Sequence, residues 1–222
     1  MLTESTENYL KSIYSLEKER GEVLTTQLAQ RLKVTPASAT GMLRKLAEMK
    51  LVSYKKYQGV ILTNSGRKIA LEVVRHHRLL ELYLNEIMGV PWDKVHLEAE
   101  KLEHAISEEL EDRIDEMLGY PTKDPHGSPI PSKTGRVEKS SSLVLADLKA
   151  GQRALIAEVD DEDSELLRYA GDLGLFPGES VTVIAIAPYK GPLTLKLKEK
   201  EVIVGREAAQ KILVSKFPVN PI

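Results

Sequence analysis

Two histidines flank three glutamates in residues 96–104, which read His-Leu-Glu-Ala-Glu-Lys-Leu-Glu-His. Residues three and four apart are neighbours on a helix, so Glu100, Glu103 and His104 would share one face, with His96 one turn earlier. Converging carboxylates and imidazoles are ligands of divalent metal ions. A solvated, charged helix face has the same composition, so this stretch alone leaves both interpretations open.

A second pair of the same kind, His77 and Glu81, lies on an earlier stretch that is expected to be helical. The spacing of four places both side chains on one face. His76 also precedes this pair, but consecutive helical residues point about 100° apart, so only one of the two histidines can face the site. We expect His77 to be that residue and to join His96.

The composition limits the other chemistry that this chain can perform. None of the 222 residues is cysteine, which excludes disulfides, thiolate nucleophiles and cysteine-ligated zinc or iron–sulfur sites. No apolar run approaches the roughly 18–20 residues of a membrane span, and the N-terminus lacks the pattern of a signal peptide. We therefore expect a cytoplasmic protein with no membrane partner.

The net charge of −2 is unevenly distributed. Residues 35–68 carry seven basic and one acidic residue, a local charge of +6, whereas residues 69–125 carry six basic and fourteen acidic residues, a local charge of −8. This pattern suggests a polyanion-binding module joined to a cation-binding module. Chance clustering on solvated helices would also explain it.

Residues 3–63 have the pattern of a winged helix-turn-helix. An amphipathic helix over 3–20 precedes a short helix, a tight turn and a second helix that Thr35 caps and Pro36 opens. An alternating pattern over 51–63 predicts a hairpin, the wing. A helical hairpin capped by a β-ribbon is the alternative without DNA binding. The residues expected to contact DNA are Thr35, Pro36, Ala37, Ser38, Thr40, Arg44, Lys45, Lys55, Lys56 and Tyr57.

Three further helices are predicted over 65–88, 92–104 and 107–118. Their apolar residues exceed what three helices need among themselves, so we expect part of this surface to form a two-fold interface. A proline-rich linker follows, and then a small β domain with predicted strands over 153–159, 180–187, 193–198 and 201–204. The expected domains are 1–65, 66–120, a linker over 121–143, and 144–222.

The order of these motifs resembles the DtxR/MntR family of metal-dependent transcriptional repressors, in the long form with a C-terminal SH3-like (FeoA-like) domain. The resemblance is carried by the ESTENYLKSIYSLE start, the LVSYKKYQGVILTNSG wing, the Glu-x-x-Glu-His segment and the DPHGSPIP stretch. It implies a mainly α fold with a small SH3-like β-barrel. It also implies a homodimer that binds a palindromic DNA operator when loaded with Mn²⁺ or Fe²⁺, with no organic cofactor.

The resemblance also implies which residues hold metal. The primary site falls on Asn8, Glu100, Glu103 and His104. Glu100 favours manganese by ligand hardness. Asn8 departs from the family pattern, as does Lys11, where some manganese members have a Glu. The ancillary positions are His77, Glu81, His96, Asp124, His126, Asp160 and Asp163, of which the last two come from an acidic run that cannot be aligned uniquely.

Two other functions remain as alternatives. A metal-independent winged-helix regulator could bind another ligand or partner through its acidic cluster. Substitution of Glu103 and His104 by Ala would then leave DNA binding intact. A metallohydrolase would also use a His/Glu cluster, with an open position on the metal. We expect no enzyme, because no separate general base is paired with a pocket and the basic helix-turn-helix would have no role.

Overall fold

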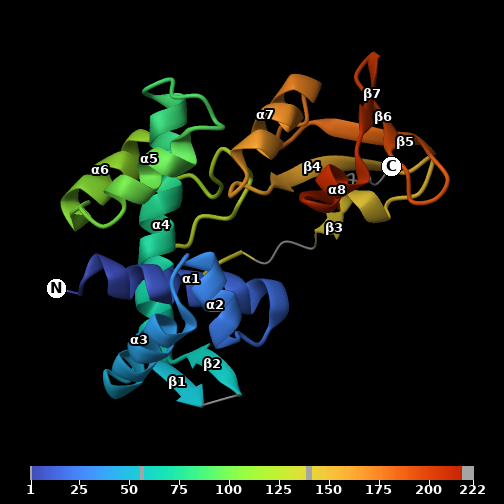
Figure 1. Cartoon of the computed structure of the whole chain (residues 1–222). Coiled ribbons are helices and arrows are strands. Elements are labelled where there is room, and N and C mark those ends of the chain that lie inside the picture. Colours follow the sequence, from blue (N-terminus) through green and yellow to red (C-terminus); the bar gives the residue numbers. More distant parts are fainter. Residues whose placement is uncertain (1, 56–57, 139–141, 217–222) are drawn as a thin grey trace. The chain divides into compact units, whose positions relative to one another are not determined.

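The computed structural model describes residues 2–55, 58–138 and 142–216 and divides into two compact units (Figure 1). The first unit contains the residues up to His77, Lys101–Glu111 and Pro131–Arg136. The second contains Arg78–Glu100, Asp112–Ile130 and the residues from Val137 onward. Each unit is described by itself below.

The first unit is built on three short helices with a shared apolar core. Helix α1 (Glu4–Arg20) begins after Thr3, whose hydroxyl oxygen accepts the Thr6 N–H at 3.3 Å. Helices α2 (Thr25–Arg31) and α3 (Pro36–Glu48) form the helix-turn-helix. The largest fully buried side chains of this core are Leu10, Ile13, Leu28, Leu43 and Leu46. The apolar spacing of the sequence therefore predicts these helices correctly.

The wing is an antiparallel hairpin of β1 (Val52–Lys55) and β2 (Gly59–Leu62). Lys55 pairs with Gly59 at its tip, while the expected contacts Lys56 and Tyr57 lie outside the described residues. Gly66, near the start of the following helix, packs against the backbone of Leu51, which directly precedes strand β1. A Cβ atom at Gly66 would be 2.0 Å from the carbonyl oxygen of Leu51.

Helices α4 (Asn64–Glu86), α5 (Val95–Leu102) and α6 (Glu108–Met117) correspond to the three predicted helices. Helix α5 is shorter at both ends than the predicted range 92–104. At its end the Ala105 N–H donates to the Leu102 carbonyl oxygen at 2.9 Å, which forms a turn instead of another helical step. Glu103 and His104 therefore lie in this turn, and the predicted helical face of Glu100, Glu103 and His104 is not formed.

The predicted linker over 121–143 needs a correction in its first part. Residues Asp124, His126 and Ser128 are buried. The Oδ1 atom of Asp124 accepts the His126 N–H at 2.8 Å and the Ser128 N–H at 3.0 Å, which closes a tight turn. As expected, the prolines exclude helix and central strand, but this segment is partly buried and is not a solvent-exposed linker.

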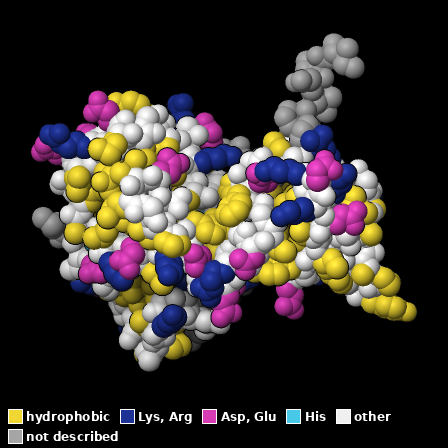
Figure 2. All heavy atoms as spheres, turned by 90° about the horizontal axis from the view of Figure 1, so that it is seen from above, with side chains coloured by type: hydrophobic (Ala, Val, Ile, Leu, Met, Phe, Trp, Pro, Cys, Tyr) yellow, Lys and Arg dark blue, Asp and Glu magenta, His cyan; other side chains and the backbone are white. Residues whose placement is uncertain are grey.

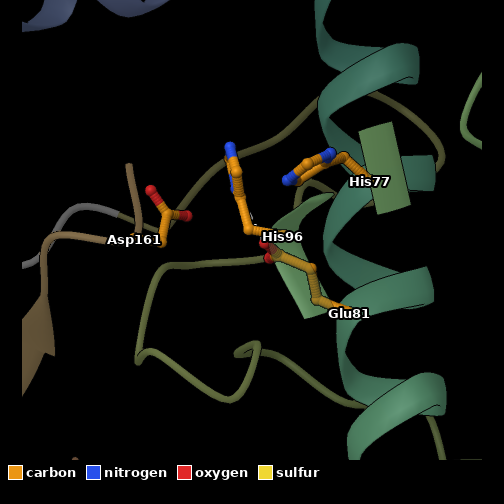
Figure 3. A group of neighbouring side chains, drawn as sticks. All are labelled: His77, Glu81, His96 and Asp161. Carbon is orange, nitrogen blue, oxygen red and sulfur yellow. Dashed lines mark hydrogen bonds and ion pairs between the residues drawn. The ribbon is translucent and has the colours of Figure 1, made fainter. Parts of the chain in front are cut away.

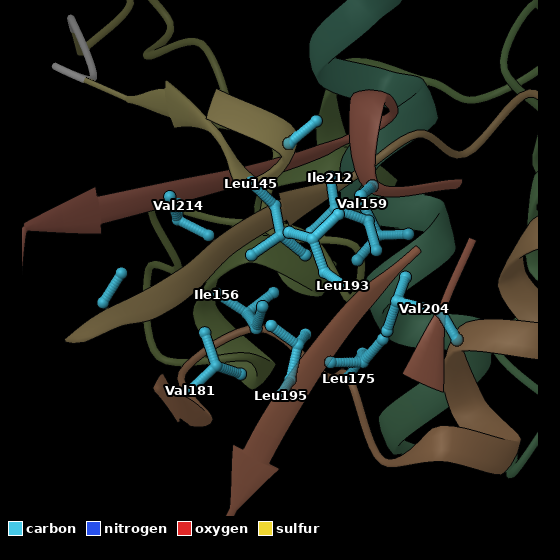
Figure 4. Packing of buried hydrophobic residues seen from close by; sticks show 14 of the residues in the cluster. Leu145, Ile156, Val159, Leu175, Val181, Leu193, Leu195, Val204, Ile212 and Val214 are labelled. Carbon is cyan, nitrogen blue, oxygen red and sulfur yellow. The ribbon is translucent and has the colours of Figure 1, made fainter. Parts of the chain in front are cut away.

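The C-terminal part of the second unit is a six-stranded antiparallel sheet with strand order β3-β8-β4-β5-β6-β7. Four strands were predicted: β4 (Arg153–Val159), β5 (Ser180–Ile186), β6 (Leu193–Leu197) and β7 (Lys200–Val204). Four further elements were not predicted from the sequence: β3 (Leu143–Val144), β8 (Ile212–Lys216), the short helix η1 (Leu145–Asp147) and helix α8 (Arg206–Gln210). Helix α7 (Ser164–Leu173) follows β4. Figure 4 shows the buried core, to which Leu145, Ile156, Val181, Leu195 and Val214 contribute.

Large apolar side chains are exposed on the helices of the second unit and in the turn after α4, namely Leu97, Met117, Ile87 and Met88. Figure 2 shows hydrophobic side chains gathered at the left of the face that it draws. Among the described residues, no helix combines the length and the apolar character that a membrane span requires. Such exposed apolar side chains are typical of a protein–protein contact.

Candidate metal centres and nucleic-acid interface

Helix α3 buries one side and presents the other to solvent. Ala39, Leu43 and Leu46 are fully buried, whereas Thr35, Pro36, Ala37, Ser38, Arg44 and Lys45 are exposed. The Thr35 hydroxyl oxygen accepts the Ser38 N–H at 3.2 Å, and the Thr40 hydroxyl donates to the Pro36 carbonyl oxygen at 2.8 Å. The N-terminal end of α3 is therefore small, polar and accessible, and two cations follow it on the next turn. This is the surface that a major groove can accept.

The first acidic group lies in the first unit and is centred on His104. Its Nδ1 atom is 2.6 Å from a carboxylate oxygen of Glu7, and its Nε2 atom is 2.8 Å from Oδ1 of Asn8. Glu103 Oε1 is 3.4 Å from the same Nε2 atom. The structure thus brings together three of the four residues expected at the primary site. Glu7, which the sequence analysis missed, joins them from the first turn of α1.

Lys11 and His77 complete this group. Lys11 Nζ donates to both Glu103 carboxylate oxygens, at 2.9 and 2.7 Å, and lies 3.1 Å from His77 Nδ1. His77 also contacts the Glu103 carboxylate directly. Burial would raise the pKa of Glu103, but hydrogen bonding and the charges of His77 and Lys11 outweigh it and hold the pKa below its usual range. Glu103 is therefore an ionised, buried carboxylate.

The neighbouring His76 has a structural role. Its Nδ1 atom is 3.2 Å from the carbonyl oxygen of Glu103 and its Nε2 atom is 3.3 Å from Glu111, which also pairs with Arg75 at 2.5 Å. Burial opposes ionisation of Glu111, yet His76 and Arg75 lower its pKa to about 2. His76 and His77 thus face different partners, as their helical offset predicts.

Glu100 belongs to the second unit and lies 3.7 Å from His96 Nε2, with a side chain that is 52 % exposed. The expectation that it shares a helical face with Glu103 fails because α5 ends between them. His96 also contacts Glu81, with Nδ1 3.1 Å from Oε1. These contacts place His96 with Glu81, as the sequence analysis predicted.

The second acidic group lies within the second unit. Ligand atoms of Glu81, Asp124, His126 and Asp161 all lie within 4.8 Å of one another, and Asp161 lies equally close to Glu81 and His96. Figure 3 shows Glu81, His96 and Asp161, together with His77, which stands one turn before Glu81 on α4. Glu81 and His126 are fully buried. Three carboxylates and two imidazoles therefore converge from α4, α5, the 121–131 segment and the loop after β4.

The orientation of His126 makes this second group suitable for a cation. Its Nε2 atom is 2.8 Å from the backbone carbonyl oxygen of Trp92, which can only accept, so Nε2 carries a hydrogen and Nδ1 is the nitrogen that can offer a lone pair once its own proton is lost. Among the described residues, His126 Nδ1 and Asp124 Oδ2 are buried without a hydrogen-bond partner. A divalent ion held by Glu81, Asp124, His126 and Asp161 would satisfy both atoms.

The protonation of this group reflects the crowding of its carboxylates. Burial raises the pKa of Asp124 to about 8, the charge of Glu81 adds to the shift, and Arg78 opposes it from 3.5 Å. For His126, burial lowers the pKa, but the nearby Glu81 and Asp124 outweigh it and raise the pKa to about 9. The buried acids therefore retain protons that a cation would replace.

The acidic run after β4 contributes a different residue from those predicted. Asp163 caps α7, because its Oδ1 atom accepts the N–H groups of Glu165 and Leu166 at 3.1 Å, and it pairs with Lys211 at 2.9 Å. Asp160 accepts the N–H of Glu162 at 3.1 Å. Asp161, rather than the predicted Asp160 or Asp163, therefore lies beside Glu81, Asp124 and His126, a choice that four consecutive acids could not reveal by themselves.

Comparison with known protein families divides the chain into three matched segments. Residues 1–60 match the iron dependent repressor N-terminal DNA binding domain, and residues 63–132 match the iron dependent repressor metal binding and dimerisation domain. Residues 143–216 match the FeoA domain. The β domain is thus of the SH3-like type that the sequence analysis predicted.

The chain is also similar to characterised repressors. The iron-dependent repressor IdeR of Mycobacterium tuberculosis is 32% identical over 97% of this chain and 98% of its own length. The regulator MntR of Bacillus subtilis is 38% identical over 54% of this chain and 84% of its own length.

Two solved structures have the same fold. A manganese-dependent transcriptional repressor in complex with manganese is 38% identical, with a TM-score of 0.89, and the match covers 96% of this chain and 100% of that one. The repressor ScaR with bound Cd²⁺ is 31% identical, with a TM-score of 0.80 over 96% of this chain and 99% of that one.

Proposed function

The chain belongs to the family of iron- and manganese-dependent transcriptional repressors, and from this premise we propose that it binds a palindromic operator as a homodimer when Mn²⁺ or Fe²⁺ is bound. Its relatives are DNA-binding repressors, which are not enzymes, so the metallohydrolase alternative has no support. The other alternative, a regulator that needs no metal, is addressed by the experiment below.

One observation carries the metal-dependent function: the group of Glu81, Asp124, His126 and Asp161, of which the first three are buried. Two of its ligand atoms have no hydrogen-bond partner among the described residues, although a buried polar atom left in this way is costly. A bound divalent ion supplies positive charge to three crowded carboxylates. The ligands are mainly oxygen atoms with imidazole nitrogen, a set that suits Mn²⁺ or Fe²⁺ better than thiophilic ions.

The first unit links its acidic group to the DNA-reading elements through α1. Asn8 and Glu7 lie on α1, and His104 and Glu103 lie in the turn after α5. Farther along α1, a Glu17 oxygen accepts the Leu62 N–H of the wing at 2.7 Å. We infer that Asn8, Glu103 and His104 fix α1 when they share a cation, and that α1 in turn fixes the wing and α3. Couplings of this kind amount to about 1–3 kcal/mol.

The test is operator binding with and without metal. DNA selected from a random library in the presence of Mn²⁺ supplies the probe, and fluorescence anisotropy measures the affinity in chelator, Mn²⁺, anaerobic Fe²⁺ and Zn²⁺. We expect the affinity to rise about 5–150-fold with Mn²⁺ or Fe²⁺. The variants Glu103→Gln/His104→Ala and Asp124→Asn/His126→Ala should each reduce that increase. The same affinity in chelator and in Mn²⁺ would favour the metal-independent regulator.

A further inference from the structure

Lys11 occupies an unusual position for a lysine on an amphipathic helix. Its ammonium group contacts both carboxylate oxygens of Glu103, at 2.9 and 2.7 Å, and lies 3.1 Å from Nδ1 of His77. The Lys11 side chain is only 17 % exposed and that of Glu103 is 1 % exposed. Two carboxylate oxygens and one imidazole nitrogen, which are atom types that bind metal ions, therefore surround the nitrogen of Lys11.

An ordinary surface ion pair in the same chain gives a useful contrast. Lys198 Nζ lies 2.8 Å from a Glu179 oxygen, but the Lys198 side chain is 76 % exposed. Water screens such a pair, which contributes little to stability. The Lys11 side chain is more shielded from water, and its ammonium contacts two side chains from different segments, so its charge interacts more strongly with them.

We propose that Lys11 is a tethered cation that neutralises Glu103, fastens α1 to the turn after α5, and permanently fills one position at which this group would otherwise hold a metal ion. The ammonium offers only N–H donors, and its charge is supplied by the chain itself. Two consequences follow. In the absence of metal, the first unit keeps the link between α1 and Glu103. In the presence of metal, the group around His104 binds one ion fewer than it would if a metal ligand replaced Lys11.

The first consequence is tested without metal and does not depend on the proposed function. In chelator, Lys11→Gln should lower the melting temperature by about 5–10 °C, because it leaves Glu103 buried without its cation. The matched control Lys198→Gln should leave it nearly unchanged. Adding Glu103→Gln to Lys11→Gln should restore much of the loss, since the unpaired charge is then removed. Equal melting temperatures for Lys11→Gln and Lys198→Gln would overturn the proposal.

The second consequence rests on the proposed function and is a count of metal ions. Equilibrium dialysis of the full-length chain with Mn²⁺ should give one more ion per protomer for Lys11→Glu than for the unmodified protein, because a carboxylate then joins Glu103 and His77. If Lys11→Glu is unfolded in chelator, recovery of its helical circular dichroism signal on adding Mn²⁺ would also show that the added carboxylate binds metal. A folded Lys11→Glu protein with an unchanged count would contradict the proposal. If the unmodified protein bound no metal at all, the proposed function would fail, while the melting experiment would still decide the role of Lys11.

Discussion

The histidines of the two acidic groups differ in what their ring nitrogens contact. Both nitrogens of His104 face side-chain oxygens, from Glu7 and Asn8. His126 instead directs Nε2 to the Trp92 carbonyl, which leaves Nδ1 toward Glu81, 3.8 Å away. The backbone carbonyl of Trp92 holds the hydrogen on Nε2, so Nδ1 is the nitrogen that could bind a cation after losing its proton.

Metal binding to the second acidic group should release protons. The pKa of Asp124 is raised to about 8 and that of His126 to about 9, so below pH 8 both groups are largely protonated and a cation must displace those protons. We expect the Mn²⁺ affinity to fall as the pH decreases from 8 to 6. Isothermal titration calorimetry in two buffers of different ionisation enthalpy would count the released protons.

The variant Asp124→Asn is the control for this prediction. It removes one titrating ligand, so it should weaken Mn²⁺ binding and reduce the number of protons released. An Mn²⁺ affinity that stays constant from pH 6 to 8 would contradict the predicted coupling.

Glu111 should make the first unit sensitive to acid. Its folded pKa of about 2 lies below the ordinary value of 4.5, so its stabilising effect is fully present above about pH 4.5 and is lost as the pH falls toward 2. We expect Glu111→Gln to lower the unfolding free energy by about 3 kcal/mol at pH 7. Urea denaturation between pH 2 and 7 would measure this. Glu108→Gln, an exposed position on the same helix, should change it by less than about 1 kcal/mol.

At the scale of elements, the junction between the wing and α4 depends on a glycine, Gly66, which has no side chain. A methyl group at Gly66 would lie 2.0 Å from the Leu51 carbonyl oxygen, so Gly66→Ala must displace the start of α4. We expect a loss of about 2–3 kcal/mol in metal-free stability. Gly41→Ala is the matched control, because nothing lies within 4 Å of its added methyl and alanine favours helix α3 by about 0.5–1 kcal/mol. Equal free energies of unfolding for Gly66→Ala and Gly41→Ala, measured by denaturant unfolding, would contradict this account.

The elements also show what sequence could and could not predict. Thr35, Pro36 and the apolar spacing define α3, because capping and burial are local properties. The end of α5 was missed because Leu102 continues the helical pattern, whereas the turn after it places His104 against Glu7 and Asn8. Strand β8 was missed because its five residues become a strand only through pairing with β4 and β3.

The candidate sites, like the secondary structure, could be predicted from the sequence only in part. The residue types and their spacing indicated Glu81, His96, Glu103 and His104, whereas Asn8 was implied only by the family resemblance. Asp161 was not separable from its acidic neighbours, because the loop conformation alone decides which of them turns inward. Nothing in the sequence marks the Trp92 carbonyl, since every residue has one.

At the scale of the whole molecule, the exposed apolar side chains of the second unit should mediate dimerisation. Leu97 is 56 % exposed and Met117 is 62 % exposed. We expect Leu97→Glu to shift the protein from dimer to monomer, because it places a charge in a contact that excludes water. Analytical ultracentrifugation would show the shift. Ile203→Glu, at an apolar position of the β domain that is 64 % exposed, is the control. A dimer that survives Leu97→Glu would place the interface elsewhere.

The ligand set of the second acidic group has a consequence for the environment in which this regulator can operate. Asp124, together with Glu81, His126 and Asp161, offers oxygen and nitrogen atoms, and the chain contains no thiol. Thiolate ligands are oxidised by peroxide to sulfenic and higher acids, which ends metal binding. Carboxylates and imidazoles do not follow that route. Peroxide should therefore not remove the ligands of this group by thiol oxidation, whereas a thiol-ligated sensor would lose its ligands in that way.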